Sequence, residues 1–178
     1  RSPAAVADLT AQVEKLNLYQ VELLAAEGIN GIILADDIAH QQGLFARPEI
    51  FRQYFIPSLA RQVEAVRRLD LPVFYHSDGN YLAVLADIIS AGFTGLQCLE
   101  KGAGMRVEEL RRHAASPICL WGHLDTADLE AAADTHYLAA LQAEIKIYAQ
   151  NGPFILGTTS GLFGGMNLEN LRKLYGSI

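Results

Sequence analysis

The sequence predicts an α/β fold of parallel strands alternating with helices, which we interpret as the later part of a (β/α)8 TIM barrel. Three observations support this. Short apolar runs alternate with helical patterns along the 178 residues, which is the order expected of β/α units. The runs at 73–75 and 154–156 are continuously apolar, as in parallel strands covered on both faces. Proline opens three predicted strands, at 72, 117 and 153, where a missing N–H does not interrupt a ladder.

The first predicted helix covers 3–27, because apolar residues recur at helical spacing between Ser2-Pro3 at the start and Gly28 at the end. A strand at 31–35 follows. The next helix covers 48–69, and Pro57 predicts a kink or short break inside it. The remaining predicted elements are strands at 72–76, 94–99, 117–121 and 153–157, and helices at 81–91, 105–114, 136–150 and from about 168.

The number of strands separates two architectures. We find about five strands, whereas a closed barrel has eight and takes roughly 250 residues. The chain is therefore a portion of a barrel or an open doubly wound sheet. Neither GxGxxG nor GxxxxGK[ST] is present, so the usual signature of a nucleotide-binding open sheet is missing and the barrel is favoured. We expect residues 1–178 to form a single domain, the C-terminal part of a barrel, and the initial arginine favours a fragment or a processed product.

Composition excludes several classes of protein. The net charge is −6, and the 14 basic residues are scattered, so a nucleic-acid partner is not expected. No run of about 18 apolar residues and no signal peptide is found, so we expect no membrane association. Cys98 and Cys119 lie inside apolar runs without CxxC spacing, which favours buried thiols and a cytoplasmic location.

Polar residues at the ends of the predicted strands are the candidate site. His76 and Asp78 stand two residues apart at a strand tip, so both side chains leave the same side of the backbone and can reach one ligand. Other predicted strands end in similar groups, namely Asp36, Asp37, Glu100, His123, Asp125 and the segment 158–160. Acidic and imidazole groups at successive strand ends are typical of a barrel active site.

Structural explanations remain open for these residues. His76 could be a structural histidine whose ring forms a hydrogen bond with Asp78 or with a backbone carbonyl. Asp78 and Gly79 could be turn residues, and Asp125 could cap a helical turn. Glu100 could form a surface ion pair with Lys101.

Several segments together resemble the C-terminal part of the uroporphyrinogen decarboxylase superfamily, which also contains methyltransferases that serve corrinoid proteins. Asp-Asp-Ile-Ala at 36–39, Arg-Pro-Glu-Ile-Phe at 47–51 and Pro-Val-Phe-Tyr-His-Ser-Asp-Gly-Asn at 72–80 carry the resemblance. It continues through 92–96, through Trp-Gly-His-Leu-Asp at 121–125, which is similar to the family's Gly-Asn-Leu-Asp stretch, and through 157–161 and 166–170. The resemblance implies a TIM barrel of this family's type whose first β/α units are missing here.

Two departures from the family's decarboxylases favour its methyltransferase branch. The decarboxylases tend to have a histidine in the loop after the last strand, where this chain has Ser160, and they lack a His-x-Asp pair on the middle strand. The methyltransferases have a His-x-Cys pair and a further cysteine that hold zinc. Here Asp78 and Ser160 stand at the cysteine positions, so a divalent metal, if one is bound, would take His76 and Asp78 as ligands.

We therefore expect a methyltransferase that acts with a corrinoid carried by a partner protein, or on a small methyl donor. The alternatives are a uroporphyrinogen decarboxylase of tetrapyrrole biosynthesis and a ligand-binding barrel fragment without turnover. The predicted catalytic residues are His76, Asp78 and Asp37. The predicted substrate-binding residues are Asp36, Gly79, Glu100, Gly122, His123, Asp125 and Ser160. Because an incomplete barrel exposes a strand edge and apolar helix faces, a homo-oligomer is a further expectation.

Overall fold

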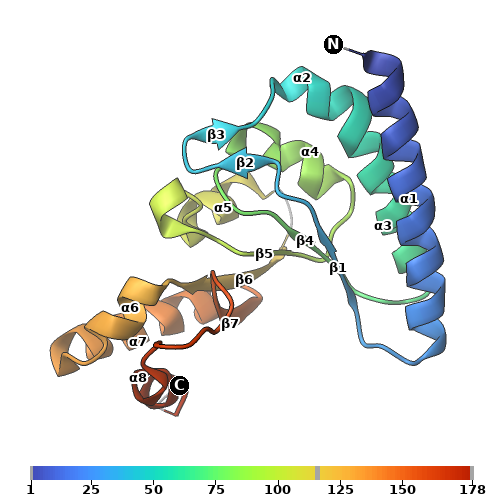
Figure 1. Ribbon diagram of the computed structural model, residues 1–178. Coiled ribbons are helices and arrows are strands. Elements are labelled where there is room, and N and C mark those ends of the chain that lie inside the picture. The colour runs from blue at the N-terminus through green and yellow to red at the C-terminus, as the bar shows by residue number, and fades with distance from the viewer. Residues whose placement is uncertain (1, 115–116, 177–178) are drawn as a thin grey trace. The chain divides into compact units, whose positions relative to one another are not determined.

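The computed structural model describes residues 2–114 and 117–176, and the chain divides into two compact units, residues 1–95 and residues 96–178. Helices and strands alternate in both units (Figure 1). The elements of the first unit are α1 (Pro3–Ala26), β1 (Ile32–Ala35), β2 (Ala39–His40), β3 (Gly43–Leu44), α2 (Pro48–Ile50), the π-helical segment η1 (Phe51–Phe55), α3 (Ile56–Arg67), β4 (Val73–His76), the 3-10 segment η2 (Leu82–Val84) and α4 (Leu85–Ser90).

The elements of the second unit follow from its first strand, which begins at the boundary. They are β5 (Gly95–Gln97), the 3-10 segment η3 (Lys101–Ala103), α5 (Val107–His113), β6 (Cys119–Leu124), α6 (Thr126–Ala131), α7 (Thr135–Gln150), β7 (Phe154–Thr158) and α8 (Leu168–Tyr175).

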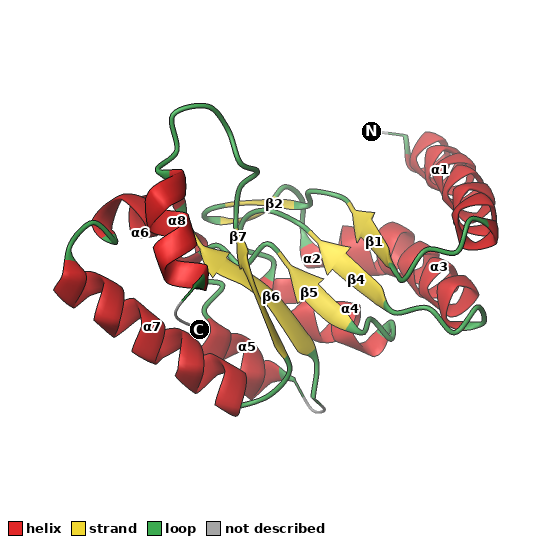
Figure 2. Ribbon diagram, turned by 90° about the horizontal axis from the view of Figure 1, so that it is seen from below, coloured by secondary structure: helices red, strands yellow, loops and turns green. Residues whose placement is uncertain are grey.

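The first unit is built on the parallel pair β1 and β4, which lie side by side in Figure 2. Their register pairs Leu34 with Tyr75 and Ala35 with His76. Leu34 and Tyr75 are buried, and Leu59, Val63 and Val66 of α3 are buried with them, so this face of the pair carries the core. His76 lies on the opposite face, because side chains alternate along a strand.

A short antiparallel hairpin, β2 with β3, follows β1 directly. No sequence pattern predicts this hairpin, because each strand has two residues and shows no periodicity. The hairpin contacts the loop after β4, where the Asn80 N–H donates to the His40 carbonyl at 2.9 Å.

The helix predicted over 48–69 is interrupted, but one turn earlier than Pro57 suggested. Residues 51–55 wind as a π-helix, and Pro57 falls in the first turn of α3, where its missing N–H costs nothing. The break therefore lies N-terminal to the proline, at a bulge that relieves the clash between the proline ring and the preceding turn.

The second unit contains β5, β6 and β7 in that order, and β6 pairs with β7 in parallel. Side chains from β6, α6, α7 and α8 form its hydrophobic core. The buried residues of this core are Leu124, Leu129, Leu141, Ile145 and Leu174. β6 is longer than the predicted strand at 117–121 and ends at Leu124, so His123 lies inside the strand and not after it. The run at 154–156 was predicted to be covered on both faces, but Ile155 is 39% exposed, so one face of β7 is open at this residue.

Side-chain caps fix the helix starts of the second unit. Asp125 caps α6 in a reciprocal capping box with Asp128, Asp134 caps α7, and Asn167 caps α8. The six-residue helix α6 was anticipated only as a helical turn that Asp125 could cap. Parallel strands with helices between them confirm the predicted α/β class.

Two smaller expectations concern the cysteines and membrane spans. Neither Cys98 nor Cys119 is in a disulfide; Cys98 is buried as expected and Cys119 only half-buried. Within the described ranges, no helix combines the length and the apolar character that crossing a bilayer requires.

Candidate active site

Three of the predicted site residues gather at the carboxyl ends of β1 and β4. The Asp37 Oδ1 atom accepts the backbone N–H of Asp78 at 2.9 Å and lies 3.7 Å from His76 Nε2. The ligand atoms of His76 and Asp78 lie within 4.8 Å of each other. The first unit thus places one imidazole and two carboxylates within reach of one small molecule.

Ser77 holds the two strand-end loops in register. Its buried hydroxyl accepts the Ile38 N–H at 3.2 Å and donates to the Asp78 carbonyl at 2.9 Å. Ile38 follows Asp37 in the chain, so this hydroxyl ties the segment that carries Asp37 to the segment that carries Asp78. Ser77 is not among the predicted site residues, although its position between His76 and Asp78 is a usable signal.

Position 79 requires glycine for a structural reason. Its φ is +75°, and a Cβ atom there would lie 2.7 Å from backbone atoms of Ala39 and His40. The loop after β4 can approach the hairpin this closely only because residue 79 has no side chain. Contact of Gly79 with a substrate stays a prediction.

Asp36 points away from its neighbour Asp37. It lines a cavity between α1 and α3, on the helix side of β1, whereas Asp37 contacts His76 and Asp78. The alternation of side chains along an extended chain separates the two carboxylates. Burial raises the pKa of Asp36, and the nearby charge of Asp37 raises it further.

In the second unit, Asp128 links the ends of two strands. Its carboxylate accepts the Lys101 ammonium at 2.6 Å, the Tyr137 hydroxyl at 2.7 Å and the Asp125 N–H at 3.0 Å. Burial alone raises the pKa of Asp128, but these hydrogen bonds outweigh it and lower the pKa. Lys101 thus forms an ion pair with Asp128, and Glu100, the predicted ligand, immediately precedes it at the start of η3.

Asp125 has the capping role that the sequence left open, since its carboxylate accepts the Asp128 N–H at 3.1 Å. A cap occupies one carboxylate oxygen, and substrate binding by Asp125 stays a prediction. Gly122 lies in β6, where a Cβ would contact Leu99 at 3.2–3.4 Å, and Ser160 is exposed after β7.

His123 is buried against a helix. Its ring meets Tyr148 of α7 edge-on, with centroids 5.4 Å apart, and only 4% of the residue is exposed. Burial lowers the pKa of His123 to about 4, and the charge of Lys101 adds to this effect. No described residue bonds to its Nε2 atom. A neutral imidazole here can accept or donate one hydrogen bond, and its predicted contact with substrate stays untested.

Comparison with known proteins supplies the family. The sequence model described as "Uroporphyrinogen decarboxylase (URO-D)" matches residues 1–178. The chain belongs to this family. A comparison of the sequence with curated proteins gave no match.

A solved structure agrees with this fold. A methyltransferase from Methanosarcina mazei superposes with a TM-score of 0.71 at 20% identity, over 92% of this chain and 46% of that protein. A putative phosphonomutase from Burkholderia cenocepacia J2315 has a TM-score of 0.49 at 18% identity, over 89% of this chain and 70% of that protein. The family match and the first superposition confirm the predicted portion of a TIM barrel of the uroporphyrinogen decarboxylase type. The chain spans about half the length of the Methanosarcina protein.

Proposed function

We propose that this member of the uroporphyrinogen decarboxylase family is a methyltransferase in which His76 is the proton donor. The cluster of His76, Asp37 and Asp78 is the observation that supports the proposal. A histidine within 3.7 Å of a carboxylate that is itself fixed by a backbone N–H has the arrangement of an oriented acid–base group.

The proposed step is a methyl transfer with general acid catalysis. The bond between the methyl carbon and its heteroatom breaks, and the electron pair stays on the heteroatom, which takes the proton of His76. The methyl group forms its new bond with a nucleophilic acceptor, which we propose to be a corrinoid carried by a partner protein. The Asp37 carboxylate stabilises the protonated imidazole before transfer and orients the ring.

In an alternative form of the mechanism, a divalent metal would be held by His76 and Asp78 and would activate the leaving group in place of the His76 proton. Their ligand atoms lie within 4.8 Å of each other, and an imidazole nitrogen with a carboxylate oxygen is a donor set suited to borderline ions. Such an ion would polarise the leaving heteroatom when bound. Asp37 would then remain the group that orients the imidazole through the contact at 3.7 Å.

Two findings support methyl transfer in particular. The Methanosarcina protein with the same fold is a methyltransferase by name. The His-x-Asp pair stands where the resemblance places the His-x-Cys pair of the family's methyltransferases, so the position keeps its imidazole and exchanges thiolate for carboxylate. The family model itself carries the name of a decarboxylase, so decarboxylation is the alternative to be tested in parallel.

The test measures methyl transfer to reduced cobalamin from a panel of methoxy compounds, methylamines and methylated pterins. His76→Ala should lower the rate by about 100- to 10,000-fold, the usual contribution of general acid–base catalysis. His136→Ala is the matched control, because His136 is exposed on α7, and it should leave the rate unchanged. Circular dichroism verifies that both variants fold.

Release of carbon dioxide from uroporphyrinogen, without methyl transfer from any donor, would assign the chain to the decarboxylases. Absence of both reactions would leave a ligand-binding barrel portion. Full methyl transfer by His76→Ala would remove His76 from the mechanism.

A further inference from the structure

A cavity of about 450 Å³ lies in the first unit, on the side of β1 opposite His76. Helices α1 and α3 form its two sides, and the end of β1 closes it. Apolar side chains make up most of its walls, among them Leu9 and Val13 from α1 and Phe55 and Leu59 from η1 and α3. The volume is at the lower end of the range, about 300–1,000 Å³, that small-molecule sites occupy.

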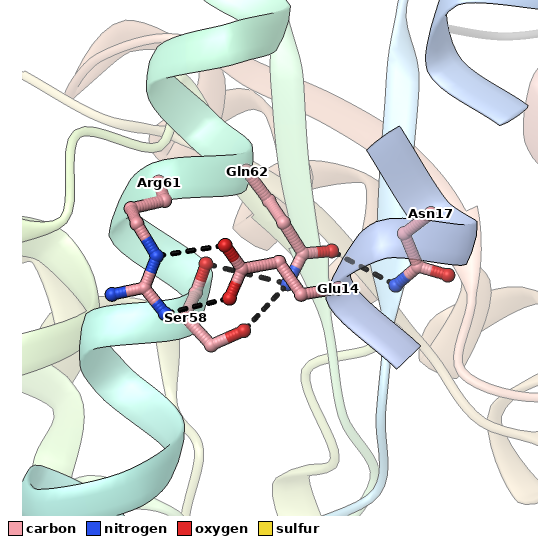
Figure 3. Close-up of polar contacts among 5 residues, drawn as sticks. All are labelled: Glu14, Asn17, Ser58, Arg61 and Gln62. Atoms are coloured by element: carbon pink, nitrogen blue, oxygen red, sulfur yellow. Dashed lines mark hydrogen bonds and ion pairs between the residues drawn. The ribbon is translucent and has the colours of Figure 1, made fainter. Parts of the chain in front are cut away.

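The polar groups on the helices around the cavity are almost all satisfied by one another (Figure 3). The Asn17 amide donates to Gln62 at 2.8 Å, and the Gln62 amide donates to the Ser58 hydroxyl at 3.2 Å and to the Ser58 carbonyl at 3.3 Å. Gln62 and Ser58 are 5% and 3% exposed, so this chain of amides is a fixed part of the wall.

The arginine that precedes Gln62 in α3 is also paired. Arg61 donates two hydrogen bonds to the Glu14 carboxylate, at 2.7 and 2.6 Å, and Figure 3 shows this pair beside Ser58. The fork geometry uses both Glu14 oxygens and lowers the pKa of Glu14. Arg61 and Glu14 are thus paired with each other, and neither of them lines the cavity.

Asp36 is the acidic residue that lines the cavity. Its backbone is fixed at both ends: its N–H donates to the His76 carbonyl at 3.1 Å, and its carbonyl accepts the Tyr75 hydroxyl at 3.1 Å. Its carboxylate has no hydrogen-bond or ion-pair partner among the residues that the structure describes. The exposed Asp36 carboxylate lies at one end of the cavity, beside the apolar side chains of α1 and η1, and its negative charge there can attract a cation.

We propose that this cavity binds a small organic cation, with an ammonium group on Asp36 and an apolar body against Leu9, Val13 and Phe55. An ammonium group supplies the donors that the carboxylate lacks, and the apolar body removes the exposed side chains of α1 from water. Because Asp36 and His76 lie on opposite sides of the strands, this site is separate from the proposed methyl-transfer site and does not depend on its reaction.

The test is calorimetric titration of the whole chain with benzylamine and 2-phenylethylamine, beside the neutral benzyl alcohol and the anionic benzoate. The amines should bind with a Kd of roughly 1 mM or below, and the alcohol and benzoate should bind at least about tenfold more weakly. Asp36→Asn should weaken amine binding by about tenfold or more. Asp8→Asn on the exposed face of α1 is the matched control and should not change it.

Two further comparisons keep the proposal testable if Asp36→Asn fails to fold. The charge series on the unmodified chain requires no substitution, and Val13→Trp should fill the cavity and abolish amine binding. The proposal is overturned if benzylamine does not bind, if benzyl alcohol binds equally well, or if a folded Asp36→Asn binds the amine with unchanged affinity.

Discussion

Replacing Gly79 by alanine tests the geometry that holds the loop of His76 and Asp78. The new Cβ would lie 2.7 Å from the carbonyl carbons of Ala39 and His40, and backbone atoms cannot rotate away as a side chain can. The φ of +75° is also unfavourable for any residue with a Cβ. Two separate penalties therefore apply at this position.

Gly28 isolates one of these penalties. Its φ is +80°, close to that of Gly79, but a Cβ there meets nothing within 4 Å. Gly28→Ala should cost about 1–2 kcal/mol, the price of a left-handed conformation alone. Gly79→Ala carries the same penalty plus a steric one of about 1–3 kcal/mol, for a total of about 2–5 kcal/mol.

Urea denaturation of the two variants and the unmodified chain measures both losses. The effect of alanine on the unfolded chain is the same at both positions, so it cancels in the difference between the variants. We expect Gly79→Ala to be less stable than Gly28→Ala by about 1–3 kcal/mol. Equal stability of the two variants would show that the hairpin does not pack on the loop after β4, and would refute the reasoning.

Further predictions concern the second unit. Asp128→Asn should destabilise it by about 2–4 kcal/mol at pH 7, because Lys101 loses its buried partner. Since the pKa of Asp128 is lowered in the folded state, its contribution is fully present above the unfolded pKa of about 3.9 and is lost as the pH falls from there through the folded pKa. The stability of the unmodified chain should therefore fall more steeply with acid than that of Asp128→Asn; parallel acid limbs for chain and variant would contradict this. For His123, NMR titration of the ring protons should give a pKa near 4. Because the buried, neutral imidazole is protonated more readily after unfolding, the free energy of unfolding should fall by at most about 3 kcal/mol between pH 6.5 and 4. His123→Asn should remove this pH dependence. A ring pKa near 6.5 would mean that the imidazole reaches water.

The proximity of Asp37 to the His76 and Asp78 pair could be predicted from the sequence in part. Side chains alternate along a strand, which predicts that His76 and Asp78 leave the backbone on the same side. The parallel β/α order predicts that the carboxyl ends of β1 and β4 meet at the same edge of the sheet. The opposite directions of Asp36 and Asp37 follow from the same period, but only the cavity between α1 and α3 gives Asp36 surroundings of its own. The sequence does not record which helix lies over which strand.

The hairpin and the partner of Lys101 could not be anticipated. β2 and β3 are too short for a periodic signal, and their position depends on the missing side chain of Gly79. Lys101 reaches Asp128, 27 positions further along the chain, and neighbours in sequence such as Glu100 give no hint of that contact. Long-range polar pairs depend on how elements pack, which local patterns do not specify.

The sequence alone determined the order of the main helices and strands, the family and the candidate imidazole–carboxylate pair. Periodicity, proline and glycine positions and motif spacing are local properties of a chain. The tertiary structure decided which carboxylate faces His76 and which one lines a cavity of its own. It also decided that His123 lies inside β6 and that Asp125 caps α6. Those outcomes depend on burial and on hydrogen bonds between residues far apart in the chain, and such contacts exist only once the elements have packed.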